Sequence, residues 1–191
     1  MEKIEALEKV GRYLLSGEQE TAKMLINEKY PFKHIEATGR TYTDKQKIQQ
    51  FKKDGFIDRY SGQKLVNPGF LKVLSHYMPK EFPYHSHWKM EECHNAYWEF
   101  IPTVDHIYPV ALGGADSEEN WATTSMLHNS IKNNWTLEQL NWELYDAGNY
   151  EEWDGLTALF IELVNSDKSL LEDSYIKKWY KLSCLNVKGQ G

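Results

Sequence analysis

The stretch from residue 103 to residue 133 constrains the fold more than any other part of the chain. TVDHIYPV, residues 103–110, has the β-branched flanks of a strand, and Gly113-Gly114 breaks it. SMLHNSIKN, residues 125–133, then has the pattern of a helix. A strand, a glycine break and a helix in such a short span predict a compact α+β centre.

Helical patterns flank this centre on both sides. Residues 2–16 place five apolar side chains at helical spacing, and a second helix is expected over 20–30. Thr43-Asp-Lys-Gln46 looks like a capping box that opens a helix running to Gly55. The remaining expected elements are a hairpin over 56–66, a helix from Asn67-Pro68, a helix from Lys89 onward, and helices over 136–148, 156–165 and 174–183.

This pattern predicts three segments. They are an N-terminal helical segment at 1–50, a central domain at 51–135 and a C-terminal helical cap at 136–191. The chain has no run of eighteen apolar residues, and its charged N-terminus lacks an apolar core and a cleavage site, so we expect a cytoplasmic protein. Cys93 and Cys184 stand alone, and two separate thiols cannot form a four-cysteine zinc site.

The net charge of −6 conceals an uneven distribution along the chain. Residues 1–30 carry −1, residues 31–90 carry +6 and residues 91–191 carry −11. A basic segment can meet phosphates, whereas an acidic one is expected to face water or a protein partner. We therefore expect the basic side chains to cluster on the side of the molecule where the site of His106 is accessible, and the acidic helices after Trp135 to lie on the opposite side. The basic candidates are Lys45, Lys47, Lys52, Lys53, Arg59 and Lys64.

Polar residues at fixed offsets stand out in the central stretch. Asp105-His106 comes before Ile-x-Pro, Asn120 follows Asp105 by fifteen residues, Asn129 follows nine later and Lys132 three later. With Gly113-Gly114 between them, these positions resemble the His-Asn-His (HNH, ββα-metal) endonuclease family. The resemblance is tight over about thirty residues and looser from Gly55 onward.

The resemblance implies a ββα-metal (HNH) nuclease core with helical additions, and a metal-dependent endonuclease of restriction, phage or defence type. His106 would be the general base, and Asp105 and Asn129 would hold one divalent metal, Mg²⁺ or another ion such as Mn²⁺. Asn120 would hold the connecting loop and orient the base, and Lys132 would meet a phosphate. Most proteins of this family cut double-stranded DNA, so the resemblance implies double-stranded DNA as the substrate.

Elementary chemistry agrees with these roles. Imidazole has an unperturbed pKa of about 6.5, so a neutral histidine such as His106 can take a proton from water. A carboxylate such as Asp105 is a hard oxygen ligand that suits Mg²⁺. Neighbouring residues of a flat strand point to opposite faces, so the family requires a distorted strand beside the metal.

The chain departs from the family in its zinc positions. Many relatives carry paired Cys-x-x-Cys knuckles there, and the corresponding residues here are Asp58, Ser61, Ser125 and His128. We therefore expect no structural zinc and expect packing by Trp98, Trp121 and Trp135 to replace it. The second departure is Asn129 in place of a histidine, so that the neighbouring His128 is an alternative metal ligand.

Three further histidines lie outside this motif. His85, His87 and His94 form either a metal site, a DNA contact or, as we favour, a cluster packed against Trp88 and Tyr84.

The basic pair Arg59 and Lys64, in the expected hairpin, supplies candidates for phosphate contact. A catalytically silent nucleic-acid-binding module on the same fold is the alternative function. The presence of both Asp105 and His106 argues for the enzyme.

Overall fold

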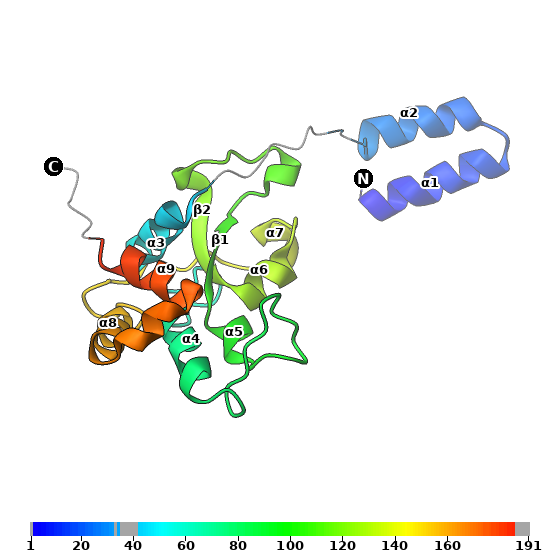
Figure 1. Cartoon of the computed structure of the whole chain (residues 1–191). Coiled ribbons are helices and arrows are strands. Elements are labelled where there is room, and N and C mark those ends of the chain that lie inside the picture. Colours follow the sequence, from blue (N-terminus) through cyan, green and yellow to red (C-terminus); the bar gives the residue numbers. More distant parts are fainter. Residues whose placement is uncertain (1, 33, 35–41, 186–191) are drawn as a thin grey trace. The chain divides into compact units, whose positions relative to one another are not determined.

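The computed structural model describes residues 2–32, 34 and 42–185. The chain divides into two compact units, Met1–Glu36 and Ala37–Gly191 (Figure 1). Parts of the expected N-terminal segment and C-terminal cap, residues 1, 33, 35–41 and 186–191, lie outside the described residues. Within the described residues, no helix is long and apolar enough to cross a membrane.

The first unit is a pair of helices. α1 (Lys3–Leu15) and α2 (Gln19–Lys29) lie side by side, as the sequence predicts (Figure 1). The turn between them uses Gly17 at φ +79°, a left-handed conformation that glycine adopts without strain. Ala6 and Ala22 are the buried hydrophobic residues of this pair.

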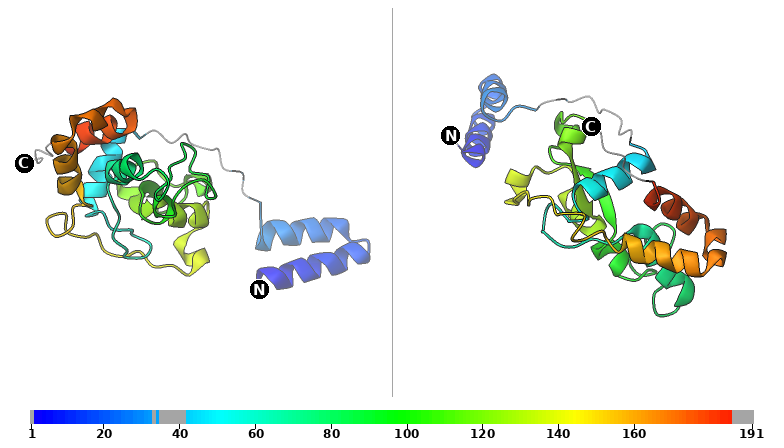
Figure 2. Two further views of the ribbon diagram at one scale, coloured as in Figure 1. Left: turned by 60° about the horizontal axis from the view of Figure 1, so that its bottom comes forward. Right: turned by 90° about the vertical axis from the view of Figure 1, so that its left-hand side faces the viewer.

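The second unit is built around a two-stranded antiparallel sheet. β1 (Pro102–His106) pairs with β2 (Trp121–Ser125), with His106 opposite Trp121. Helix α6 (Met126–Lys132) follows β2 directly, and both strands contact it. The strands also contact α3 (Asp44–Lys53), which makes the described fold α+β (Figure 2).

Local signals explain why the longer helices form where they do. Thr43 and Gln46 form the expected capping box at the start of α3. Asn67 caps α4 (Pro68–Tyr77), with proline in the first turn. The helices α8 (Thr157–Ser166) and α9 (Ser174–Ser183) also lie where the sequence predicts them.

Three expected elements are shorter than predicted. The helix expected from Lys89 is the single turn α5 (Ala96–Glu99), and the helix expected over 136–148 is the single turn α7 (Leu137–Leu140). Asn141 ends α7 in a left-handed conformation at φ +54°. The hairpin expected over 56–66 is a pair of turns joined by one isolated bridge between Ile57 and Lys64.

The core joins segments that the sequence led us to separate. α3 from the expected N-terminal segment, and α8 and α9 from the expected cap, pack against the sheet in one apolar cluster. Its buried members are Ile48, Phe51, Phe56, Val73, Val104, Trp121, Phe160, Val164, Leu170, Ile176 and Trp179. The packing therefore unites residues on both sides of the expected boundaries at 50 and 135, because the small sheet needs these helices to cover it.

The edge of β2 is closed by carboxylates instead of by a third strand. Asp54 Oδ2 accepts a hydrogen bond of 2.7 Å from the Thr123 amide, and Asp58 Oδ2 accepts one of 2.9 Å from the Ser125 amide. The Arg59 amide donates to the Thr123 carbonyl at 2.8 Å. The turns at 54–59 therefore satisfy the edge groups that a neighbouring strand would otherwise pair with.

Asn67 links three parts of the core, which generates a test of the fold. Its Oδ1 caps α4 through the Gly69 amide, and its Nδ2 donates to the hydroxyls of Thr157 and Ser183. We expect Asn67→Ala to lower the free energy of unfolding by about 2–3 kcal/mol, since it removes a cap and takes a hydrogen-bond donor away from two buried hydroxyls. Thr43→Ala removes a more exposed cap and should cost about 1 kcal/mol. Urea unfolding of both variants measures the difference, and equal losses would contradict the role assigned to Asn67.

Candidate functional site

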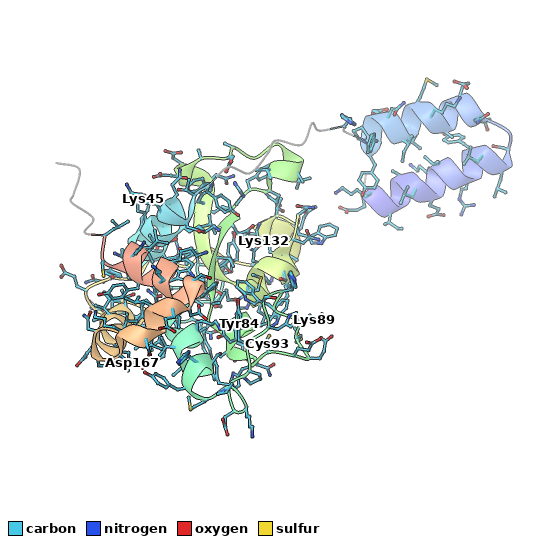
Figure 3. All side chains as sticks on the ribbon, viewed as in Figure 1. Lys45, Tyr84, Lys89, Cys93, Lys132 and Asp167 are labelled. Atoms are coloured by element: carbon cyan, nitrogen blue, oxygen red, sulfur yellow. The ribbon has the colours of Figure 1, made fainter. Side chains whose placement is uncertain are left out.

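A buried ion pair fixes Asp105 at the end of β1. Lys132 is the last residue of α6 (Figure 3). Its Nζ lies 2.8 Å from Asp105 Oδ2 and also donates to the His106 carbonyl at 2.8 Å. The Tyr60 hydroxyl donates to the same carboxylate oxygen at 2.8 Å. Burial and the nearby Asp105 charge raise the pKa of Tyr60, which keeps its hydroxyl protonated and able to donate.

His106 is held through one ring nitrogen only. Its Nε2 lies 2.8 Å from Asp116 Oδ1, which also accepts from Trp121 Nε1 at 3.1 Å. His106 Nδ1 is buried and has no hydrogen-bond partner among the described residues. A carboxylate that accepts the Nε2 proton selects the tautomer in which Nδ1 carries the lone pair. Nδ1 is therefore the nitrogen that can accept a proton, although His106 is 1% exposed. The register of β1 is regular, so His106 lies on the opposite face of the sheet from Asp105, and the strand distortion that the resemblance implies is not found.

Asn120 closes the loop that connects the strands. Its Oδ1 accepts from the Tyr108 amide at 2.8 Å, and its Nδ2 donates to the carbonyls of Tyr108 and Ala115 at 2.9 and 2.8 Å. Gly113 sits at φ +92°, and a Cβ on Gly114 would lie 2.1 Å from the Tyr108 carbonyl oxygen. The loop thus needs both glycines, and Asn120 ties its two ends together.

The amide of Asn129 has a defined orientation. Its Nδ2 donates to Thr103 Oγ1 at 3.0 Å, and Thr103 Oγ1 donates in turn to the Thr124 carbonyl at 3.1 Å. Because the threonine hydroxyl proton is used there, Asn129 must be the donor in the first bond, and its Oδ1 stays available as an acceptor. Thr103 and Asp105 are alternate residues of β1, so they share the face that α6 covers.

The oxygen donors of β1 and α6 suit a divalent metal. Among the described residues, no group of three or more His, Cys, Asp or Glu side chains is placed to hold an ion. Asp105 on β1 and Asn129 on α6 nevertheless offer a carboxylate and an amide oxygen, and hard oxygen donors suit Mg²⁺. In the described part of the chain, Asp105 pairs with Lys132 and Asn129 with Thr103, and these contacts do not join Asp105 to Asn129. Two protein ligands are enough for Mg²⁺, which keeps several waters and binds substrate phosphates. The donor set therefore fits an oxygen-ligated divalent ion.

A hydrogen-bond network occupies three of the four positions where the resembled family has zinc knuckles. Asp58 Oδ2 accepts from His128 Nδ1 at 2.7 Å and from the Ser125 amide, and its Oδ1 accepts from the Tyr60 amide at 2.9 Å and from Thr124 Oγ1 at 3.0 Å. Burial acts to raise the pKa of Asp58, but these hydrogen bonds outweigh it and lower the pKa overall. His128 Nδ1 is thus engaged by Asp58, and the alternative role of His128 as a metal ligand stays a prediction.

The tryptophans contribute unequally to this region. Trp121 is buried in the core, as we expected, and Trp98 packs at the edge of a second apolar cluster. Trp135 is 54% exposed, so the prediction that it braces the fold is wrong. Trp142 takes that place, with its ring edge-on to His128 at 5.6 Å and beside Tyr60 at 5.8 Å.

The basic residues expected to meet phosphates have internal partners. Lys132 is fully buried against Asp105. Arg59 forms a 2.8 Å ion pair with Asp54 and donates to the Tyr145 carbonyl, and Lys64 lies 4.7 Å from the centre of the Trp153 ring. In this structure Lys132 and Arg59 are structural cations, and the sequence did not reveal their partners.

The expected separation of basic and acidic surfaces is not found. The acidic segment around α7 lies next to the site, because Trp142 packs on Tyr60 and the Tyr145 amide donates to the Arg59 carbonyl. Lys47 pairs with Asp44 on its own helix, and Lys52 approaches the Ser183 carbonyl at 3.5 Å near the end of α9. Contacts made on folding, which charge counting ignores, determine these positions.

The histidine cluster does not converge on one point. His94 stacks on Phe82 with ring centres 4.1 Å apart, and His85 lies 5.7 Å from His87 and 3.5 Å from a Glu92 carboxylate oxygen. The expected packing of histidines against aromatic rings is found for His94, with Phe82 as its partner.

Sequence reasoning missed Asp116 and Tyr60, which contact His106 and Asp105. Asp116 follows the glycine pair closely, and a carboxylate at this point of the loop is a signal that could have been used. Tyr60 lies 45 residues before Asp105, and nothing in the sequence links the two. Comparison of the chain with protein-family models, with curated proteins and with solved structures found no match.

Lys132→Met tests the buried ion pair. It should lower the free energy of unfolding by about 3–5 kcal/mol, because the Asp105 carboxylate is left buried without a counter-charge. Asp105→Asn combined with Lys132→Met removes both charges and should restore part of that loss. Chemical unfolding measures both variants, and a double variant less stable than Lys132→Met would contradict the ion-pair account.

Asp58→Asn tests the network that links the turn at 58–62 to α6. Because the pKa of Asp58 is lowered in the folded state, its stabilisation is complete above the unfolded value of about 3.9 and is lost as the pH falls through the folded value. We expect the variant to be about 2 kcal/mol less stable at pH 7 and the difference to shrink below about pH 4. Asp146→Asn, at an exposed position, serves as the control. A difference that does not change with pH would contradict the assignment.

Proposed function

We propose that the chain is a metal-dependent endonuclease that hydrolyses phosphodiester bonds in DNA, most suitably double-stranded DNA. The observation that carries this proposal is the state of His106, whose Nε2 is held by Asp116 while Nδ1 lacks a partner among the described residues. A histidine used only for packing would gain from satisfying both nitrogens. The strand, loop and helix order around it, with Asp105 and Asn129 at the offsets of the HNH motif, supports the same reaction.

Each residue of the site has a separate chemical task. His106 Nδ1 accepts a proton from the attacking water, and Asp116 stabilises the imidazolium that forms. Asp105 and Asn129 offer the oxygens that would hold a divalent ion, with Lys132 fixing the second oxygen of Asp105. A bound ion would supply charge neutralisation at the phosphate and help for the leaving oxygen. Asn120 keeps the loop closed behind the base.

A second function is favoured by one specific observation. His106 is 1% exposed, and the Asp105 carboxylate is paired with a buried lysine, so the charged groups of the site are paired without a ligand. A catalytically silent nucleic-acid-binding module would keep such a closed arrangement permanently. The nuclease requires substrate binding to expose Nδ1, and the two functions therefore differ in whether any cleavage occurs.

His106→Ala distinguishes them. The purified protein is incubated with plasmid DNA and Mg²⁺ or Mn²⁺, with and without a chelator. We expect metal-dependent cleavage by the wild type and a rate about 10²–10⁴-fold lower in the variant, because the general base is gone. His76→Ala, on the exposed surface of α4, is the matched control and should cleave like the wild type.

Each result has a defined meaning. Cleavage by His106→Ala at the wild-type rate would overturn the catalytic assignment. DNA binding by the wild type without cleavage under any of these metals would favour the silent module. A circular dichroism spectrum identical to the wild type shows that His106→Ala has kept its fold.

A further inference from the structure

The N-terminal helix pair carries an apolar stripe that the pair itself does not cover. Ile4, Leu7, Leu14 and Leu15 of α1 are between 45% and 91% exposed. At 100° per residue they lie within about a quarter of the helix circumference, so they form one face. Figure 3 shows side chains on α1 that project away from α2.

This stripe is distinct from the face that holds the pair together. Ala6 is buried and Tyr13 is partly buried, and both lie about 80° or more around α1 from the nearest residue of the stripe, while the partly buried Val10 lies at the border between the two faces. The polar face, with Glu8 paired to Arg12, is a third side. The apolar stripe is therefore additional to the internal contact.

The pair is too small to be stable through its internal contact alone. It spans fewer than forty residues, has two buried alanines as its core and contains no cysteine. Units of this size need disulfides, metals or association to fold. Burial of the stripe against a partner would supply the apolar contact that this unit lacks.

Gly11 lies in the middle of the stripe and gives an independent indication. A Cβ at this position would meet nothing within 4 Å, so the internal packing of the pair does not require glycine. Glycine inside a helix is unfavourable compared with alanine. A glycine between exposed leucines instead suits the close approach of another helix.

The charges of the unit favour a second copy over a partner of opposite charge. Residues 1–30 carry a net charge of −1. Within the described part, six charged side chains of these helices form local pairs, Arg12 with Glu8, Lys23 with Glu20 and Lys29 with Glu28. Two such units neither repel each other strongly nor present a field that would select a charged ligand.

The spacing of the stripe also suits a twofold axis. If two α1 helices cross antiparallel at Gly11, Leu7 of each copy meets Leu15 of the other, since both lie four residues from the crossing point. A contact of this kind is isologous and closes after two chains. We propose that α1 and α2 form a dimerisation unit, in which two copies of the chain associate through this stripe as a four-helix bundle.

The oligomeric state of the full chain tests the proposal. Sedimentation equilibrium should give twice the monomer mass of 22.4 kDa at micromolar concentration. Leu7→Gln combined with Leu14→Gln should raise the dissociation constant at least about 100-fold, because four leucine side chains leave the interface. Glu5→Gln combined with Lys9→Gln makes matched changes on the exposed polar face and should leave the dimer intact.

Gly11→Ala provides a second, more local measurement. In an isolated pair alanine would fit and would favour the helix, whereas at a close crossing it should weaken the dimer about tenfold. Circular dichroism checks that each variant keeps its helices. A monomeric wild type at about 100 µM, a dimer that survives the two leucine changes, or loss of the dimer in the control variant would each overturn the proposal.

Discussion

The ammonium group of Lys132 is the interaction on which the arrangement of the second unit depends. Lys132 is the last residue of α6 and is fully buried. Its ammonium group binds both the Asp105 carboxylate and the His106 carbonyl. A charge in this position is tolerated only with such partners, so the helix cannot slide or rotate against the strand without leaving it unpaired. The positions of Asp105, His106 and Asn129 relative to one another follow from this single anchor.

Two buried carboxylates hold the other strand, β2, by accepting hydrogen bonds from its backbone. Asp54 and Asp58 accept backbone amides of β2, and each also binds a cationic or imidazole side chain, Arg59 and His128 respectively. The small domain thus joins its turns to its sheet by charge-assisted hydrogen bonds, which are stronger than neutral ones. Such bonds are directional, and they hold the loop bearing Tyr60 in register with β1.

The sequence predicted those features whose causes lie within a few residues. The capping box at Thr43, the proline start at Pro68 and the helix over 174–183 depend on local chemistry and are found where expected. The prediction of a helix over 136–148 was wrong, because Asn141 adopts a left-handed conformation that ends the helix. The backbone of Tyr145 then hydrogen-bonds to Arg59, which is 86 residues away in the sequence. The internal partners of Lys132 and Arg59 were missed for the same reason, since an apolar or charge pattern does not report distant contacts. The nuclease activity stays a prediction.

The closed edge of β2 has a consequence for the behaviour of the protein in acid. A strand edge with free amides and carbonyls is a template onto which another chain can add, and proteins avoid aggregation by blocking it. Here the group that blocks the Ser125 amide is the Asp58 carboxylate, which accepts hydrogen bonds less well once it is protonated, and hydrogen bonds from its neighbours lower its pKa. Protonation of Asp58 would therefore weaken the cover of the strand at Ser125, and the same carboxylate that stabilises the fold also protects an edge onto which another chain could pair.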